Sequence, residues 1–202
     1  MDALIFHAND QLPDLELRVG DIEYDCWVDL SATATEVYWK FREKSTTSIL
    51  ASGKCSKLYS GTTGYCLLSW ENTDLDDLDA GSYELEITTC FEVSTGTLTG
   101  ATVASPVVIT DVAHGLTTGD EVYISGVVGM TELNDEIYTV TVIDADSFSL
   151  DSVDGSAYTA YTSGGTWEKL TGRQTSNKYF FEGQEDTNWD SKSLPIKMRA
   201  DF

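Results

Sequence analysis

The chain has 202 residues, with 34 acidic and 12 basic side chains and a formal net charge of −22. Such a surface repels nucleic-acid phosphates and anionic lipid headgroups, so we expect no nucleic-acid partner. No run approaches the roughly 18 apolar residues that span a bilayer, so we expect no membrane insertion. A hydrophobic content of 41% exceeds that of a solvated acidic tail, which predicts a folded chain with one large or two small domains.

The sequence contains few residues that are suited to metal binding or redox chemistry. The four cysteines form no C-x-x-C pair, and the chain has only two histidines, so neither a zinc site nor a dithiol motif is indicated. We expect the cysteines to serve as small core residues. We expect no cofactor, no metal and no catalytic residue.

The acidic residues are unevenly distributed along the chain. Eleven of them lie between Thr97 and Glu168, where no Lys or Arg occurs, and the rest of the chain holds all 12 basic residues. An internal segment whose charge composition differs from that of the chain on both sides predicts one domain inserted into another. The Gly-rich turns at 96–100 and 163–165 are the expected junctions. We therefore expect an N-terminal arm at 1–14, a discontinuous domain at 15–96 plus 169–202, and an inserted acidic domain at 97–168.

Strands dominate the predicted secondary structure. Apolar and polar residues alternate at 22–28 and 83–91, which predicts strands with one buried face, and Cys90 falls on the outer face. Runs rich in β-branched and aromatic residues predict further strands at 37–42, 65–70, 107–110, 121–125, 137–142, 147–150, 178–182 and 195–200. At most one helical turn is expected, at 73–78. Short strands with Gly, Asp and Ser turns are typical of sandwiches and small barrels.

The most specific local pattern lies at Asp79, Gly81 and Tyr83. An Asp, a small residue and a Tyr at the entry to an alternating strand predict the tyrosine corner of immunoglobulin-like sandwiches. The alternative is a calcium site built from four clustered acids, Asp74, Asp76, Asp77 and Asp79. Their spacing differs from the D-x-[DN]-x-[DN]-G loop, which favours the corner.

Residues 114–120 predict a double turn. Gly115 and Gly119 can adopt positive φ, and Leu116 between them can enter the core. His114 is either a residue that hydrogen-bonds locally at this turn or the general base of a hydrolase. No G-x-S-x-G or other nucleophile motif accompanies it, which favours the local role. Nearby, Asp144 and Asp146 are either turn formers or half of a metal site.

Two groups of apolar side chains are expected at the surface. Trp27 and Trp189 lie at outward or loop positions, where aromatic rings mark a protein contact surface or stack against sugars. Leu4, Ile5 and Phe6 make the N-terminal arm too apolar to remain in water. We expect the arm to pack on a partner or on its own sandwich.

The outer part of the chain carries an Arg-x-Gly-Asp start, a Gly-led strand that ends in Trp, and a Gly-x-Tyr corner. The matching residues are Arg18, Gly20, Asp21, Gly64, Trp70, Gly81 and Tyr83. In these motifs the outer part resembles the N-terminal immunoglobulin-like domain of tailed-phage baseplate upper proteins. The resemblance implies a sandwich fold, which the strands at 178–182 and 195–200 would complete.

The inner part carries a different series of motifs. They are Ser-Pro at 105–106, His-Gly-Leu-x-x-Gly-Asp at 114–120, Gly-Val-x-Gly-Met at 126–130 and Asp-Gly-Ser-x-Tyr at 154–158. This segment resembles the small barrel beside the first catalytic cysteine half-domain of ubiquitin-activating enzymes, a module that recurs in phage tail and virion proteins. The resemblance implies a barrel that supplies no catalytic residues itself.

We therefore predict an all-β chain, an immunoglobulin-like β-sandwich with an inserted small β-barrel. The resemblances imply a non-enzymatic virion component of a tailed phage, made in the host cytoplasm, which serves as tail or baseplate adaptor, capsid decoration or fibre attachment. Its expected partners are other virion structural proteins, with several copies per particle. A carbohydrate-binding module that recognises a host glycan is the alternative, and a secreted hydrolase that uses His114 is a third class.

Overall fold

The computed structural model describes residues 4–7, 14–21, 26–32, 35–44, 46, 49–70, 81–91, 93–170, 177–181 and 193–199. The fold is all-β, as predicted, and the helical structure in these ranges is the 3-10 turn η2 (Thr131–Leu133). Within the described residues, no helix is both long and apolar enough to cross a membrane. The chain divides into a sandwich unit, Met1–Glu92 with Gly172–Phe202, and a barrel unit, Val93–Thr171.

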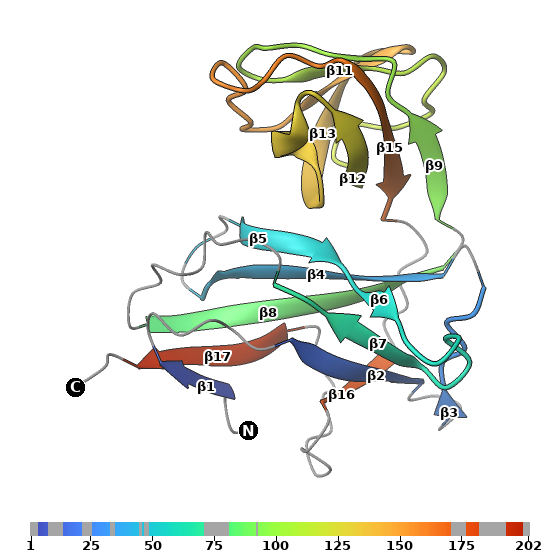
Figure 1. Ribbon diagram of the computed structural model, residues 1–202, viewed down its shortest axis with the longest axis vertical. Helices are drawn as coiled ribbons and strands as arrows, with labels where there is room; N and C mark the ends of the chain where they lie inside the picture. Colours follow the sequence, from blue (N-terminus) through green and yellow to red (C-terminus); the bar gives the residue numbers. More distant parts are fainter. Residues whose placement is uncertain are drawn as a thin grey trace. The chain divides into compact units, whose positions relative to one another are not determined.

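The first sheet of the sandwich unit contains five strands in the order β1-β17-β8-β4-β5 (Figure 1). Their bounds are β1 Leu4–His7, β17 Ser193–Arg199, β8 Gly81–Cys90, β4 Glu36–Glu43 and β5 Ile49–Lys54. β1 runs parallel to β17, and the other neighbours are antiparallel. Residues 4–7, which the sequence assigned to an arm, thus have their backbone paired within the chain's own sandwich.

The second sheet has the order β16-β2-β7-β6, and β3 pairs with β2 beside β7. The bounds are β16 Asn177–Phe181, β2 Leu15–Asp21, β7 Tyr65–Leu68, β6 Ser56–Lys57 and β3 Cys26–Trp27. The order β2-β7-β6 opposite β17-β8-β4-β5 is that of strands B-E-D opposite G-F-C-C′ in variable-type immunoglobulin domains. Leu17 of β2 and Phe41 of β4, which are both fully buried, belong to one core cluster between the two sheets.

The outer face of β8 is not solvent-exposed along its whole length. Alternation holds from Tyr83 to Ile87, but Thr88, Thr89 and Cys90 are all buried. Cys90 is therefore buried, as expected for the cysteines, although the alternation at 83–91 places it on the outer face. The residues of β8 and its neighbour β4 are buried on both faces at this end. In β4, every residue from Glu36 to Phe41 is buried.

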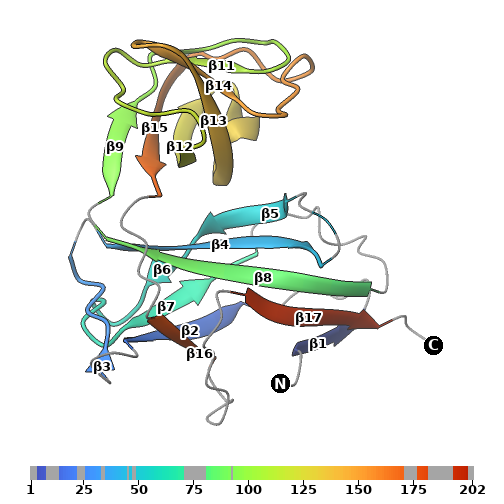
Figure 2. The ribbon, with the colours of Figure 1, turned by 180° about the vertical axis from the view of Figure 1, so that it is seen from behind.

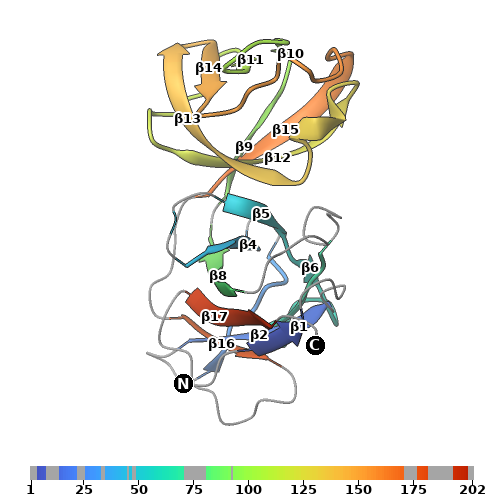
Figure 3. The same cartoon turned by 90° about the vertical axis from the view of Figure 1, so that its left-hand side faces the viewer.

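The barrel unit is a single seven-stranded sheet in the order β10-β11-β14-β13-β12-β15-β9. The bounds are β9 Ser94–Thr97, β10 Gly100–Ala101, β11 Val108–Thr110, β12 Glu121–Val128, β13 Glu136–Asp144, β14 Ser147–Leu150 and β15 Ser163–Lys169. The first and last strands of this order are consecutive in the chain. The Leu98 N–H donates to the Gly165 carbonyl at 3.0 Å and the Thr99 N–H to the Thr110 carbonyl at 2.8 Å, so residues 94–101 join both ends of the curled sheet (Figure 3).

The limits of the barrel unit lie outside the range 97–168 expected from charge. Ser94–Thr97 pairs with β15, and Figure 2 shows the two strands side by side where the chain enters and leaves the unit. Ser, Thr and Gly carry no charge, so a count of acids and bases does not register this strand. The unit also contains one basic residue, Lys169, at the end of β15.

Truncation of the barrel core should destabilise this unit selectively. Phe148 is fully buried among the apolar side chains of the barrel, whereas Ile143, in the adjacent strand, is 55% exposed. We expect Phe148→Ala to lower the free energy of unfolding of the barrel unit by about 3–5 kcal/mol, and Ile143→Ala by less than about 1 kcal/mol. Chemical denaturation followed by circular dichroism measures both variants. Equal losses in the two would contradict this description of the core.

Candidate functional site

His114 is held inside a double turn of the barrel unit. Its Nδ1 accepts the Leu116 N–H at 3.0 Å, and its Nε2 lies 3.0 Å from the Asp144 carbonyl oxygen. Gly115 and Gly119 have φ of +65° and +92°, the left-handed conformation that the turn requires. Leu116 is 6% exposed and lies in the barrel core. Both ring nitrogens of His114 are therefore engaged with backbone groups.

The carboxylates near His114 also accept hydrogen bonds within local turns. Asp144 Oδ1 accepts the Asp146 N–H at 2.9 Å and the Ser147 hydroxyl at 2.8 Å. These hydrogen bonds hold the pKa of Asp144 below its ordinary value. Asp146 Oδ1 accepts the Ala113 N–H at 2.9 Å. Each acid thus fixes a turn, and no group of three possible metal-ligating side chains occurs among the described residues.

Asp111 and Trp167 form a polar contact within the barrel unit. The Trp167 indole N–H donates to Asp111 Oδ2 at 2.7 Å, and Trp167 is only 3% exposed. Gly96 of β9 leaves the space for this pair, since a Cβ there would collide with both side chains. A buried indole N–H without an acceptor is costly, so Asp111 has a structural role that charge counting alone does not reveal.

Removal of the Asp111 carboxylate should weaken the barrel unit. We expect Asp111→Ala to cost about 1–3 kcal/mol, because the buried indole of Trp167 loses its acceptor. Asp111→Asn keeps an acceptor oxygen and should cost less. Hydrogen exchange of the Trp167 indole proton reports the bond directly. Asp151→Ala is the control, since Asp151 is exposed and bonds to Thr141; equal exchange rates in all three variants would contradict the proposed role of Asp111.

Asp120 and Lys169 form an ion pair between the start of β12 and the end of β15. Lys169 Nζ lies 2.6 Å from Asp120 Oδ2, which also accepts the Thr117 N–H at 2.7 Å. Burial raises the pKa of Asp120, but the hydrogen bonds from Lys169 and Thr117 outweigh it and hold the pKa below its ordinary value. The pair joins the double turn to the strand by which the chain leaves the barrel unit.

The Asp120–Lys169 pair predicts acid sensitivity. Because the pKa of Asp120 is lower in the folded than in the unfolded chain, its contribution to stability is present above the ordinary pKa of an aspartate and disappears as the pH falls through the folded-state pKa. Asp120→Asn should therefore destabilise the barrel unit at neutral pH and have little effect in stronger acid. Urea unfolding at several pH values measures this difference. Lys169→Met should show the same trend, and purely additive losses in the double variant would contradict a direct pair.

Gly81 and Tyr83 of the predicted corner lie at the start of β8. The Tyr83 ring is 6% exposed and stacks on Phe41 with ring centroids 5.2 Å apart. A Cβ on Gly81 would lie 3.3 Å from this ring, so a small residue is favoured there. Asp79 lies outside the described residues, as do Trp189 and the other three acids of the alternative calcium site. The tyrosine corner therefore stays a prediction.

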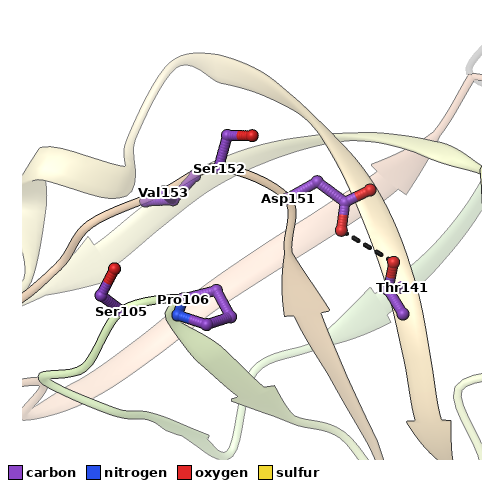
Figure 4. Close-up of a pocket in the computed structure, with 6 residues that line it drawn as sticks. All are labelled: Ser105, Pro106, Thr141, Asp151, Ser152 and Val153. Carbon is purple, nitrogen blue, oxygen red and sulfur yellow. Dashed lines mark hydrogen bonds between the residues drawn. The ribbon is translucent and has the colours of Figure 1, made fainter.

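A shallow polar depression of about 510 Å³ lies beside the sheet of the barrel unit. Its lining residues are Ser105, Pro106, Thr141, Asp151, Ser152 and Val153. Figure 4 shows the Asp151 carboxylate bent towards Thr141, whose hydroxyl donates to it at 2.8 Å, and away from Ser105. The two serines have no histidine among these lining residues to activate them, so the depression does not assemble a nucleophile and a base.

An organised row of aromatic and basic side chains lies on the outer face of the second sandwich sheet. The Arg18 guanidinium carbon lies 3.5 Å from the ring centroid of Trp27 and 4.6 Å from that of Tyr65. Tyr59 meets Tyr65 edge to face at 5.5 Å. Trp27 is 42% exposed and Tyr59 66%. We call Arg18, Trp27, Tyr59 and Tyr65 the Arg18 row.

The sequence indicated only one member of the Arg18 row as a contact residue, Trp27. Arg18 and Tyr65 are directly opposite each other in the pairing of β2 with β7, a relation that requires the strand register. Trp39, by contrast, is 4% exposed and packs edge-on against Trp70 in the sandwich core, with ring centroids 4.9 Å apart. The exposed aromatic surface thus centres on Arg18.

The comparison with known protein families concerns the barrel unit. Residues 106–170 match the ubiquitin-activating enzyme E1 FCCH domain. The match extends from just before β11 to the residue after β15, so the barrel unit is similar to that domain, as its motifs predict. No curated protein matches the chain.

Proposed function

We propose that this protein is a structural component of a tailed-phage virion that acts by docking its sandwich unit onto neighbouring virion proteins. The observation that carries the docking role is the Arg18 row, which combines exposed Trp27 and Tyr59 with an ordered arginine. Trp, Tyr and Arg are the residue types enriched at the energetic centres of protein interfaces. The phage assignment rests on the motifs of the outer part and on the recurrence of the barrel module in phage tail proteins.

In this proposal the barrel unit is an acidic spacer or adhesion element. Its strands β9 and β15 lie side by side where the chain enters and leaves, so an inserted domain can vary without disturbing the pairing within the sandwich. Its charge disfavours binding to nucleic acid, which suits a position on the particle surface.

A carbohydrate-binding module is the second candidate function. The exposure of Trp27 and Tyr59 favours it, because sugar rings stack against exposed aromatic faces. Glycan-array binding that Trp27→Ala abolishes would support this alternative.

The protein should be a constituent of purified virions. Mass spectrometry of dissociated particles should detect it in several copies per particle, in constant ratio to the major capsid protein through successive purification steps. A phage replication protein provides the control for contamination, since it should disappear during purification. If the protein disappears with it, the virion role is wrong.

A further inference from the structure

Arg18 is fixed in place before any partner binds. Its Nε–H donates to the Thr63 carbonyl at 3.0 Å, and its guanidinium contacts the rings of Trp27 and Tyr65. Contacts between a guanidinium and the faces of aromatic rings stabilise the side chain in this position. An arginine held in this way loses less rotamer entropy on binding than a mobile one.

The backbone around the Arg18 row is shaped to bring its members together. Gly64 has φ of +77°, and a Cβ there would lie 2.7 Å from the Val19 carbonyl oxygen and 3.6 Å from Trp27 Cβ. Only glycine therefore allows β3 and β7 to meet along the same edge of β2. Tyr59 also has a positive φ, of 50°, in a turn closed by the bond from the Leu58 N–H to the Tyr65 carbonyl. Such conformations are costly for residues other than glycine.

Arg18 also differs from Arg42, the other arginine whose side chain is described. Arg42 Nη2 lies 3.3 Å from Glu84 Oε2 and 3.7 Å from Glu86 Oε2. Within the described part of the chain, Arg18 has no carboxylate partner. With Nε bonded to Thr63, the edge formed by the two terminal nitrogens is the one that a carboxylate can bind in bidentate fashion.

We propose that the Arg18 row binds a protein segment that presents a carboxylate. An Asp or Glu side chain of the partner bonds end-on to the two terminal nitrogens of Arg18, and its apolar neighbours pack against Trp27 and Tyr59. A protein fits better than a sugar, because Arg18 already covers part of the surface of the Trp27 and Tyr65 rings. This inference deepens the docking role proposed above, but its test uses the isolated chain and needs no virion.

The test is a selection of displayed random peptides on the immobilised full-length chain. Selected peptides should contain Asp or Glu next to an aromatic or aliphatic residue. We expect synthetic versions to lose about tenfold or more in affinity when the protein carries Arg18→Gln or when the peptide acid becomes its amide. Arg18→Lys should restore only part of the affinity, since lysine cannot form the bidentate pair.

Two controls separate binding from folding. Arg42→Gln removes an arginine that is already paired within the chain, so it should leave peptide affinity unchanged. The unfolding midpoint of Arg18→Gln shows whether the sandwich unit remains folded, and Tyr59→Ala, which alters an exposed ring, supplies a second variant with the same expected loss of affinity.

Several outcomes would overturn the inference. They are the selection of no peptide, peptides without an acid, equal affinity for the chain and for Arg18→Gln, or glycan-array binding that Arg18→Gln abolishes, which would assign the row to sugar. Absence of the protein from purified virions would overturn the proposed function and leave this site untouched. The two failures are therefore distinguishable.

Discussion

The treatment of strand edges shapes both units, because an open edge invites association with other chains. The barrel unit meets this need with residues 94–101, which bond to β15 on one side and β11 on the other. In the sandwich unit, β1 pairs with β17 and β16 with β2. At the opposite ends of its two sheets, Lys54 and Lys57 both pair with Glu36, at 3.5 and 3.3 Å, which adds charge where β5 and β6 end the sheets.

Closure of the barrel explains why its interior contains specific polar contacts. A sheet that curls on itself must fit β9 against β15, and Gly96 provides the room for the bond between Trp167 and Asp111. In the double turn, His114 likewise forms hydrogen bonds with backbone groups that have no partner in a neighbouring strand. The acidic residues of this unit thus have a structural role besides their charge. Asp111 and Asp144, for example, accept hydrogen bonds from the unit's own groups.

Local signals in the sequence predicted the turns and many strands, whereas relations between distant strands were missed. Gly115, Leu116 and Gly119 fix their turn through neighbours in the chain, so the pattern alone was sufficient. The sequence of β5 did not indicate a strand, because it contains Gly53. This glycine is required by a contact with a distant residue: a Cβ there would lie 2.9 Å from the ring atoms of Trp39. The Arg18 row was missed for the same reason, since it depends on the pairing of β2 with β3 and β7.

Net charge and local charge act at different distances in this protein, and this restricts the partner of the Arg18 row. The formal charge of −22 repels an acidic protein at long range, although salt screens it beyond about 8 Å at physiological ionic strength. That net charge already includes Lys54, Lys57, Arg42 and Lys169, which are paired within the chain. Arg18 acts only at contact. The carboxylate that it binds must therefore stand on a surface that is otherwise neutral or basic, because a strongly acidic partner would be slowed before the rings of Trp27 and Tyr59 could contact it.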